Sequence, residues 1–151
     1  MASQHTFVIL KPDAVQRGLI GEILARFERK GLLIVGMKFI TATTDQAAKH
    51  YQEHKEKPFF GGLIQFIISS PMVALVLEGD EAITVVRTLI GATDGRKAAP
   101  GTIRGDFGIS KSNNLVHGSD SPESATRELA IWFPDRPISW TSATAAWVQG
   151  D

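Results

Sequence analysis

His117 is the first residue whose position suggests chemistry. It ends a short predicted strand over 114–117 and lies just ahead of a helix that Ser121 is expected to cap. Backbone N–H groups and the helix dipole favour an anion at such a place. On that helix Glu128 stands at the edge of the apolar stripe, where a carboxylate could hold the imidazole in one tautomer. A turn histidine and a solvated glutamate are the plainer interpretations of the same pattern.

Three cationic side chains are candidates for binding phosphate. Arg87 falls within the apolar face of a predicted helix, and arginine is rarely buried unless it is paired. Its planar fork suits a phosphate group, although an internal salt bridge or a side chain that reaches back to solvent fits the pattern too. Arg104 lies on a glycine-flanked loop that a ligand could approach closely. Lys11 lies at the end of the first predicted strand, where a surface lysine is the commoner case.

Other residue patterns narrow the chemistry. Phe59, close to Gly61 and Gly62, fits either a core residue or a ring that stacks on a base. The chain has no cysteine, which excludes a disulfide scaffold, a thiolate zinc site and a cysteine nucleophile. It also lacks the P-loop, the Rossmann glycine fingerprint, the HExxH helix and the GxSxG elbow. The usual nucleotide-binding scaffolds are therefore excluded.

The composition is that of one globular domain. The 151 residues are 43% hydrophobic and 21% charged, so residues 1–151 are expected to form a single domain. Sixteen basic and sixteen acidic residues give a net charge of zero, which argues against nucleic acid as a primary partner. The first residues lack the pattern of a signal peptide, and no apolar run approaches the roughly 20 residues that span a bilayer. We therefore expect a cytoplasmic location and no membrane partner.

Apolar patterning predicts alternating strands and helices. Strands are predicted over 7–10, 32–40, 72–77 and 114–117, and helices over 20–30, 44–54, 63–68, 81–90 and, as the final helix, 122–133. Gly31 and Asp80 are expected to cap helices, and Thr43 with Gln46 has the pattern of a capping box. The segment 91–113 looks too irregular for regular structure, and a loop of this length is usually functional. Alternation alone would favour a parallel sheet.

Four groups of residues carry a resemblance to a known family. They are 114–121 (Asn-Leu-Val-His-Gly-Ser-Asp-Ser), 100–106 (Pro-Gly-Thr-Ile-Arg-Gly-Asp), 11–13 with 16–18 (Lys-Pro-Asp and Gln-Arg-Gly), and 50–51 with 57–60 (His-Tyr and Lys-Pro-Phe-Phe). With them the chain resembles nucleoside diphosphate kinase from about Thr6 to Trp147. The resemblance implies an α/β (α+β) fold, a ferredoxin-like sandwich with a four-stranded antiparallel sheet and helices on one face.

The resemblance also implies roles for ten residues. His117 would be the nucleophile that becomes phosphohistidine, with Glu128 hydrogen-bonded to its other ring nitrogen and Tyr51 close by. The implied phosphate-binding residues are Arg87, Thr93 and Arg104. Lys11 and Asn114 would bind ribose hydroxyls, and Phe59 would stack on the base with Leu63 nearby.

The implied reaction is reversible transfer of the γ-phosphate of a nucleoside triphosphate, typically ATP, to a nucleoside diphosphate by a ping-pong mechanism. Mg²⁺ is the implied cofactor, because it bridges and neutralises phosphate oxygens; no protein ligand is assigned to it. Stacking reads the π-face of any base, so broad base specificity is expected. The implied assembly is a homohexamer built from three dimers.

Two other functions are alternatives. One is a regulatory or nucleic-acid-binding protein that keeps the fold, against which the full set of implied site residues argues. The other is a phosphorelay protein whose histidine passes its phosphate to an aspartate. The chain departs from the family pattern at Asp94-Gly95, where many members have Asn-Pro, and this is expected to loosen the loop. It also departs at Ser70 and in the tail 148–151.

Overall fold

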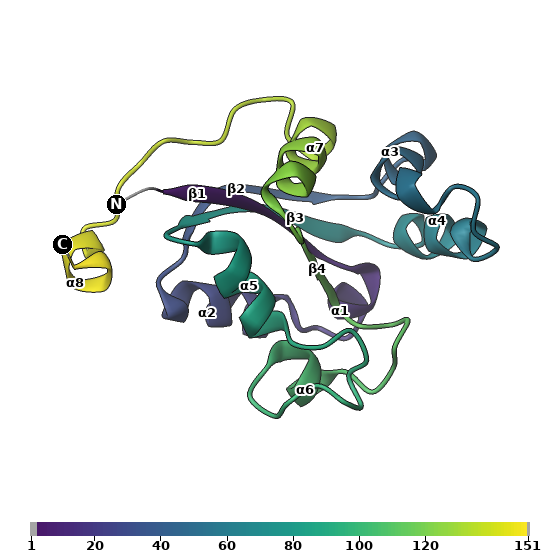
Figure 1. Cartoon of the computed structure of the whole chain (residues 1–151), viewed down its shortest axis with the longest axis horizontal. Helices are drawn as coiled ribbons and strands as arrows, with labels where there is room; N and C mark the ends of the chain where they lie inside the picture. Colours follow the sequence, from purple (N-terminus) through teal and green to yellow (C-terminus); the bar gives the residue numbers. More distant parts are fainter. Residues whose placement is uncertain (1–2, 151) are drawn as a thin grey trace.

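The computed structural model describes residues 3–150 of the chain. Its centre is a four-stranded sheet in the order β2-β3-β1-β4. The strands are β1 (Gln4–Leu10), β2 (Leu33–Ile40), β3 (Met72–Gly79) and β4 (Val116–Gly118). All three neighbouring pairs are antiparallel. The antiparallel sheet implied by the family resemblance is confirmed (Figure 1).

The strand order explains why alternation along the chain does not give a parallel sheet. β1 and β2 lie on either side of β3, and β3 and β4 lie on either side of β1. The crossovers from β1 to β2 and from β3 to β4 therefore each join two strands that run in the same direction, with an antiparallel strand inserted between them. Strands and helices do alternate along the chain, but the parallel strand pairing that such alternation usually predicts does not form.

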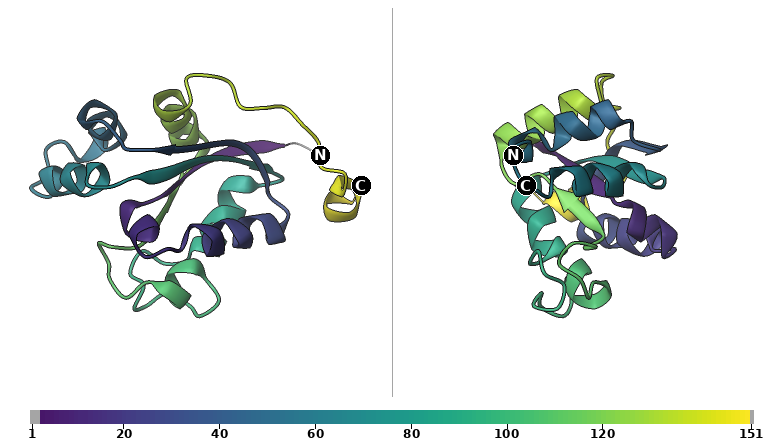
Figure 2. Two further views of the ribbon diagram at one scale, coloured as in Figure 1. Left: turned by 180° about the vertical axis from the view of Figure 1, so that it is seen from behind. Right: turned by 90° about the vertical axis from the view of Figure 1, so that its right-hand side faces the viewer.

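Helices cover both faces of the sheet, so the expectation of helices on one face is wrong (Figures 1 and 2). One face packs against α1 (Pro12–Gln16), α2 (Ile20–Lys30), α5 (Ala82–Ile90) and α6 (Ile103–Phe107). The other face packs against α3 (Thr44–His50), α4 (Phe60–Ile68) and α7 (Pro122–Trp132). In β1, Val8 and Leu10 face the first layer, and Phe7 and Ile9 face the second. A strand buried on both faces reads as a continuous apolar run, which is the pattern seen in this strand.

Helix ends follow the local capping signals only in part. Gly31 ends α2 in the left-handed region (φ 106°), and Thr43 and Gln46 form the predicted capping box at the start of α3. α3 ends at His50 and a short 3₁₀ helix, η1 (Gln52–His54), follows, so the helix predicted to residue 54 is too long. The residue at the N-cap of α5 is Glu81 (φ 51°), so the expectation that Asp80 caps this helix is wrong.

Three α-helices were not predicted from the sequence: α1, α6 and α8. α6 lies inside the segment expected to be irregular, because Thr102 accepts the N–H of Gly105 and caps this short helix. α8 (Ala145–Gln149) follows the helix predicted to be the last. The segment before it runs along the start of β2, where Ile138 N–H donates to the carbonyl of Val35. Within residues 3–150, no helix has the length and apolar character needed to cross a bilayer.

The Asp94-Gly95 step is tied down, which contradicts the expected loosening of the loop. The Asp94 carboxylate accepts bonds from the backbone N–H and the guanidinium of Arg96, at 2.9–3.1 Å. These bonds lower the pKa of Asp94 to about 2. The backbone of Gly95 touches that of Gly108 so closely that a Cβ on Gly95 would lie 2.5 Å from the Gly108 carbonyl. Glycine is therefore required here by a close approach of two backbone segments.

Gly95→Ala is expected to lower the free energy of unfolding by about 1–3 kcal/mol, because the added methyl group forces the two loop segments apart. The matched control is Gly21→Ala, since nothing lies within 4 Å of a Cβ added at this position of α2. That control is expected to raise the free energy of unfolding by about 0.4–1 kcal/mol. Urea unfolding of both variants measures the difference, and an unchanged midpoint for Gly95→Ala would contradict the contact.

Candidate active site

His117 lies in the middle of β4, opposite Ile9 of β1. The strand begins after Leu115, whose φ of 74° lies in the left-handed region that leucine rarely adopts. Lys11 N–H donates to the carbonyl of Leu115 (2.8 Å), and the Leu115 N–H donates to Oδ2 of Asp13 (3.0 Å). These two bonds hold the strained residue in place, and so they fix the direction in which β4 presents His117.

The imidazole of His117 is oriented by a buried carboxylate. Its Nε2 lies 2.9 Å from Oε1 of Glu128, and the hydroxyl of Ser119 donates to the same oxygen at 2.7 Å. Glu128 is 4% exposed and Ser119 is 0% exposed. A carboxylate only accepts hydrogen bonds, so the ring proton belongs on Nε2 of His117. The other nitrogen, Nδ1, therefore keeps its lone pair.

A cavity of about 210 Å³ lies beside His117 and brings together four of the predicted residues: His117, Glu128, Tyr51 and Arg87. Burial, and then the charge of Glu128, raise the pKa of Tyr51 to about 12, so its hydroxyl keeps its proton. This group is therefore a hydrogen-bond donor at neutral pH.

Arg87 is exposed, so its predicted place within the buried face of α5 is wrong. The residues that fill this face are Ile83, Val86 and Ile90. Arg87 instead turns toward β4, where its guanidinium donates to the carbonyl of Gly118 at 3.3 Å. This places a cation at the rim of the His117 cavity.

Lys11, Asn114, Thr93 and Arg104 form a second group beside β4. Lys11 Nζ donates to Oδ1 of Asn114 (2.9 Å), and Nδ2 of Asn114 donates to the carbonyl of Thr93 (3.2 Å). Burial, and then the charge of Arg104, lower the pKa of Lys11 to about 8. Burial, and then the charge of Arg87, lower the pKa of Arg104 to about 10. The cations of the two groups therefore lie close enough to repel one another.

Arg104 has a structural task that the sequence does not reveal. It is 7% exposed, and its guanidinium donates to the carbonyls of Asn114, Gly91 and Val116 at 3.1, 3.3 and 2.6 Å. These bonds pin the backbone on either side of Leu115. A guanidinium has five N–H groups, so two of them are left over for a ligand.

Phe59 and Leu63 lie on the α4 side of the site, outside both groups. Phe59 is 52% exposed, and its ring centroid lies 5.5 Å from that of His54. Leu63 is half-buried one turn further along the chain. The exposed face of Phe59 is therefore open to a ligand that enters past His54.

Sequence reasoning missed several residues of the cavity. His50, His54 and Arg127 all line it. The guanidinium of Arg127 donates to the carbonyls of Lys49 and His50 and lies 3.6 Å from Oε2 of Glu128. His50 precedes Tyr51 and Arg127 precedes Glu128, so each is adjacent in sequence to a residue that was predicted. Neither falls on a periodic pattern that would have identified it.

His50, His117 and Glu128 are close enough to raise the question of a metal centre, because one ligand atom of each lies within 4.8 Å of the others. Nδ1 of His117 keeps a free lone pair, but Nδ1 of His50 and Oε1 of Glu128 already accept hydrogen bonds. Trp132 Nε1–H donates to Nδ1 of His50 at 3.1 Å, which leaves the proton of the neutral ring on Nε2. Nε2 of His117 donates to Glu128. This donor set does not fit a transition metal.

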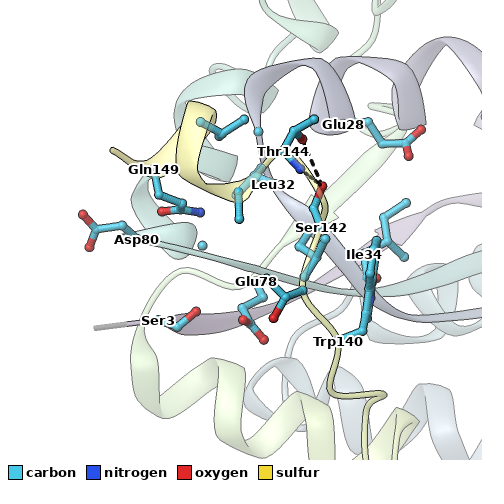
Figure 3. Close-up of a pocket in the computed structure, with 16 residues that line it drawn as sticks. Ser3, Glu28, Leu32, Ile34, Glu78, Asp80, Trp140, Ser142, Thr144 and Gln149 are labelled. Atoms are coloured by element: carbon cyan, nitrogen blue, oxygen red, sulfur yellow. Dashed lines mark hydrogen bonds between the residues drawn. The ribbon is translucent and has the colours of Figure 1, made fainter. Parts of the chain in front are cut away.

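A second cavity, of about 390 Å³, lies at the far end of the sheet (Figure 3). The C-terminal segment, with Trp140 and Ser142, closes it against Ile34 and Glu78. Its charged lining residues are Glu28, Glu78 and Asp80, which would repel a phosphate. The smaller cavity around His117 is therefore the candidate active site.

An oriented imidazole with a free Nδ1, near arginine and lysine side chains on an α/β sandwich, is an arrangement that can act as a nucleophile toward an anionic substrate. The model of the nucleoside diphosphate kinase family matches residues 4–138, and the chain belongs to this family. The protein is accordingly a nucleotide-binding phosphotransferase with nucleoside-diphosphate kinase activity.

Similar proteins agree over almost the whole chain. A nucleoside diphosphate kinase of Archaeoglobus fulgidus is 55% identical over 96% of this chain and 97% of its own length. The solved structure of a halophilic nucleoside diphosphate kinase from Halobacterium salinarum in complex with CDP has a TM-score of 0.94 and 50% identity, covering 97% of this chain and 99% of that one. A nucleoside diphosphate kinase family protein from Babesia bovis has a TM-score of 0.93 and 49% identity, covering 96% and 99%. The ferredoxin-like fold is thereby confirmed.

Arg104→Ala is expected to lower the free energy of unfolding by about 3 kcal/mol, because it leaves buried carbonyls without their donors. Arg87→Ala is expected to change it by less than about 1 kcal/mol, since this side chain is exposed. Thermal and urea unfolding of the two variants compare them directly. Equal losses would show that Arg104 does not pin the strand.

Proposed function

We propose that the enzyme transfers the γ-phosphate of a nucleoside triphosphate, typically ATP, to a nucleoside diphosphate through a phosphohistidine formed on His117. The observation that carries this proposal is the hydrogen bond from Nε2 of His117 to the buried Glu128, which leaves Nδ1 as the nucleophile. Donor and acceptor nucleotides would bind in turn in the cavity beside His117, as a ping-pong mechanism requires.

In the first half-reaction, Nδ1 of His117 attacks the γ-phosphorus. The N–P bond forms while the bond from phosphorus to the β-phosphate oxygen breaks, and the electron pair leaves on the nucleoside diphosphate. The ring becomes positively charged, and Glu128 stabilises that charge through the Nε2–H bond. A second nucleoside diphosphate then reverses these steps with its own β-phosphate oxygen.

The other predicted residues would hold the nucleotide. Arg87 at the cavity rim and the two remaining N–H groups of Arg104 would bind phosphate oxygens together with Thr93, and Tyr51 would donate its hydroxyl near His117. Lys11 and Asn114, already joined by a hydrogen bond, would bind the ribose hydroxyls. The exposed ring of Phe59 would stack on the base beside Leu63, which favours broad base specificity.

Mg²⁺ is the proposed cofactor, and the oxygen donors of the cavity fit it. Asp120 and Glu53 line its open side. Hydrogen bonds from Ser124 and Ser121 and the charge of Arg87 lower the pKa of Asp120, so its carboxylate is ionised. Mg²⁺ binds few protein carboxylates and takes its other ligands from phosphates and water. When bound it would neutralise charge on the phosphate oxygens.

A homohexamer of three dimers is the proposed assembly. Its support is the edge strand β2, where Met37 and Phe39 are 58% and 64% exposed, beyond the part of the edge that the C-terminal segment covers. Exposed edge strands with apolar side chains are rarely left unpaired.

The one sheet shared by both core layers of residues 3–150 supports a single domain over 1–151, whose first two residues and last residue lie outside the described part. The cytoplasmic location stays a prediction.

Incubation with γ-labelled ATP and Mg²⁺ is expected to label His117, and addition of an unlabelled diphosphate is expected to remove the label. The label should be acid-labile and base-stable. His117→Ala should abolish it, whereas His5→Ala, which removes an exposed histidine paired with Glu78, should not. Transfer that persists in His117→Ala would refute the mechanism.

The affinity for a nucleoside diphosphate is expected to fall by about tenfold between pH 7.5 and 9.5. Lys11 carries its charge below its pKa of about 8 and loses it above, so attraction to the nucleotide weakens as the pH rises. Calorimetric titration with a nucleoside diphosphate at each pH measures this affinity. Lys11→Gln should bind the nucleoside diphosphate weakly at both pH values, with no loss of affinity at high pH. A loss of affinity that persists in this variant would assign the titration to another group.

Phe39→Arg is expected to stop dimerisation through β2, because it places a charge on the exposed edge. Ile109→Arg, at a side chain of similar exposure (78%) away from this edge, should leave the dimer intact. Light scattering over a dilution series compares both with the unaltered chain. A stable dimer or tetramer of the unaltered chain at high concentration would contradict the hexamer.

A further inference from the structure

His50 is the buried titratable group that the proposed mechanism leaves without a task. It is the last residue of α3, it is 5% exposed, and it lines the same cavity as His117. The two imidazole rings are nearly perpendicular (82°), with centroids 4.7 Å apart. His50 therefore lies directly beside the place where a phosphoryl group would be bound on His117.

Trp132 fixes the tautomer of His50. The indole N–H donates to Nδ1 of His50 at 3.1 Å, and Trp132 is only 1% exposed. An indole nitrogen can only donate, so Nδ1 must accept and the ring proton must lie on Nε2. Protonation of His50 would bring two N–H donors face to face, and the bond would be lost.

The surroundings also keep His50 neutral. The titratable and charged groups that face it are Lys11 at the end of β1, Tyr51 after α3, His54 of η1, His117 of β4, and Arg127 and Glu128 of α7. Burial, and then the charges of His117, Arg127, Lys11 and His54, hold the pKa of His50 well below its ordinary value of 6.5. At neutral pH the residue is thus an uncharged ring with one defined donor.

That donor is open to the cavity. Nε2 of His50 has no hydrogen-bond partner among residues 3–150. It is also not fully buried, because the fully buried side-chain atoms without a partner in this part of the chain are Thr6 Oγ1 and Asp13 Oδ1. Nε2 of His50 therefore keeps access to the cavity that it lines. A side chain that is almost completely buried presents one free N–H to the reaction site.

We propose that His50 is a further catalytic residue, a neutral donor whose Nε2–H binds an oxygen of the phosphoryl group during its transfer to and from His117; this rests on the proposed phosphohistidine. The transition state of phosphoryl transfer spreads negative charge over three oxygens, so an oriented donor stabilises it. A cation at this distance would lower the nucleophilicity of His117, whereas a neutral ring does not. Trp132 acts as a positioning residue that holds the donor in its productive tautomer.

Two substitutions at His50 separate donation from packing. His50→Leu fills the site without a donor, and His50→Gln can place an amide N–H near the position of Nε2. Rapid-mixing measurement of His117 labelling by γ-labelled ATP should show a fall of about 10- to 100-fold for His50→Leu and less than about fivefold for His50→Gln. The affinity for a nucleoside diphosphate should change by less than about twofold in both.

Trp132→Phe tests the tautomer without touching the donor itself, because it removes the indole N–H and keeps an aromatic ring beside Phe7. NMR of the full chain with ¹⁵N-labelled histidine should show His50 protonated at Nε2 from pH 6 to 8. In Trp132→Phe the Nδ1–H tautomer should appear, the titration of His50 should move to higher pH, and labelling should slow. Phe133→Leu, on the neighbouring core residue, should leave the tautomer unchanged.

The outcomes distinguish this inference from the mechanism beneath it. Labelling of His117 at an unaltered rate in His50→Leu overturns the role of His50 and leaves the phosphohistidine standing. If His50→Leu does not fold, a mixed tautomer with unaltered labelling in Trp132→Phe overturns it equally. Absence of label on His117 in the unaltered chain defeats the proposed function itself, whatever tautomer NMR finds at His50.

Discussion

The hydrogen bond between Nε2 of His117 and Oε1 of Glu128 is the interaction on which the site depends. Because Glu128 is almost entirely removed from water, an unpaired carboxylate there would be costly, and Ser119 shares the task of satisfying it. The bond links β4 to α7, the helix that follows this strand in the chain. The packing of α7 against β1 therefore decides which nitrogen of His117 is free to react.

The backbone at the start of β4 is held by side chains and backbone groups from other segments of the chain. Leu115 is held in a strained conformation by Lys11 and Asp13, and Arg104 binds the carbonyls on either side of it. Lys11, Arg104 and Arg87 lie close together in this region. Their mutual repulsion contributes to the lowered pKa values of Lys11 and Arg104. A bound phosphate would relieve that repulsion, so the free enzyme is already organised for an anionic ligand.

The sequence predicted the central pair of the site better than it predicted the residues around it. His117 and Glu128 could be found because one follows a strand signal and the other lies at the edge of a helical stripe. The backbone contacts of Arg104 could not be found, because a bond to a carbonyl leaves no trace in the residue types of its partners. His50 was missed because its significance comes from Trp132, which is 82 residues away in the chain. Arg87 was misplaced because helical periodicity cannot separate a buried position from its exposed neighbour at the edge of a stripe.

In the fold, too, the features set by neighbouring residues could be predicted, and those set by distant residues could not. Strand and helix positions followed from apolar patterns and caps, since these depend on neighbouring residues. Strand order did not, because it depends on which strand is inserted between two others, and the antiparallel sheet could be expected only through the family resemblance. The short α6 was missed because a single capping threonine, Thr102, outweighs the glycines around it. The stiffness of Asp94-Gly95 arises from contact with Gly108, which no local rule predicts.

The role of Glu128 can be tested by finding which ring nitrogen of His117 is phosphorylated. NMR of the phosphorylated enzyme, with ¹⁵N in its histidine rings, reports through nitrogen–phosphorus coupling which nitrogen carries the phosphoryl group. Because Glu128 holds the proton on Nε2, the phosphorus is predicted to be bonded to Nδ1. A phosphoryl group on Nε2 would contradict the account, since that nitrogen would then have to leave Glu128 in order to react.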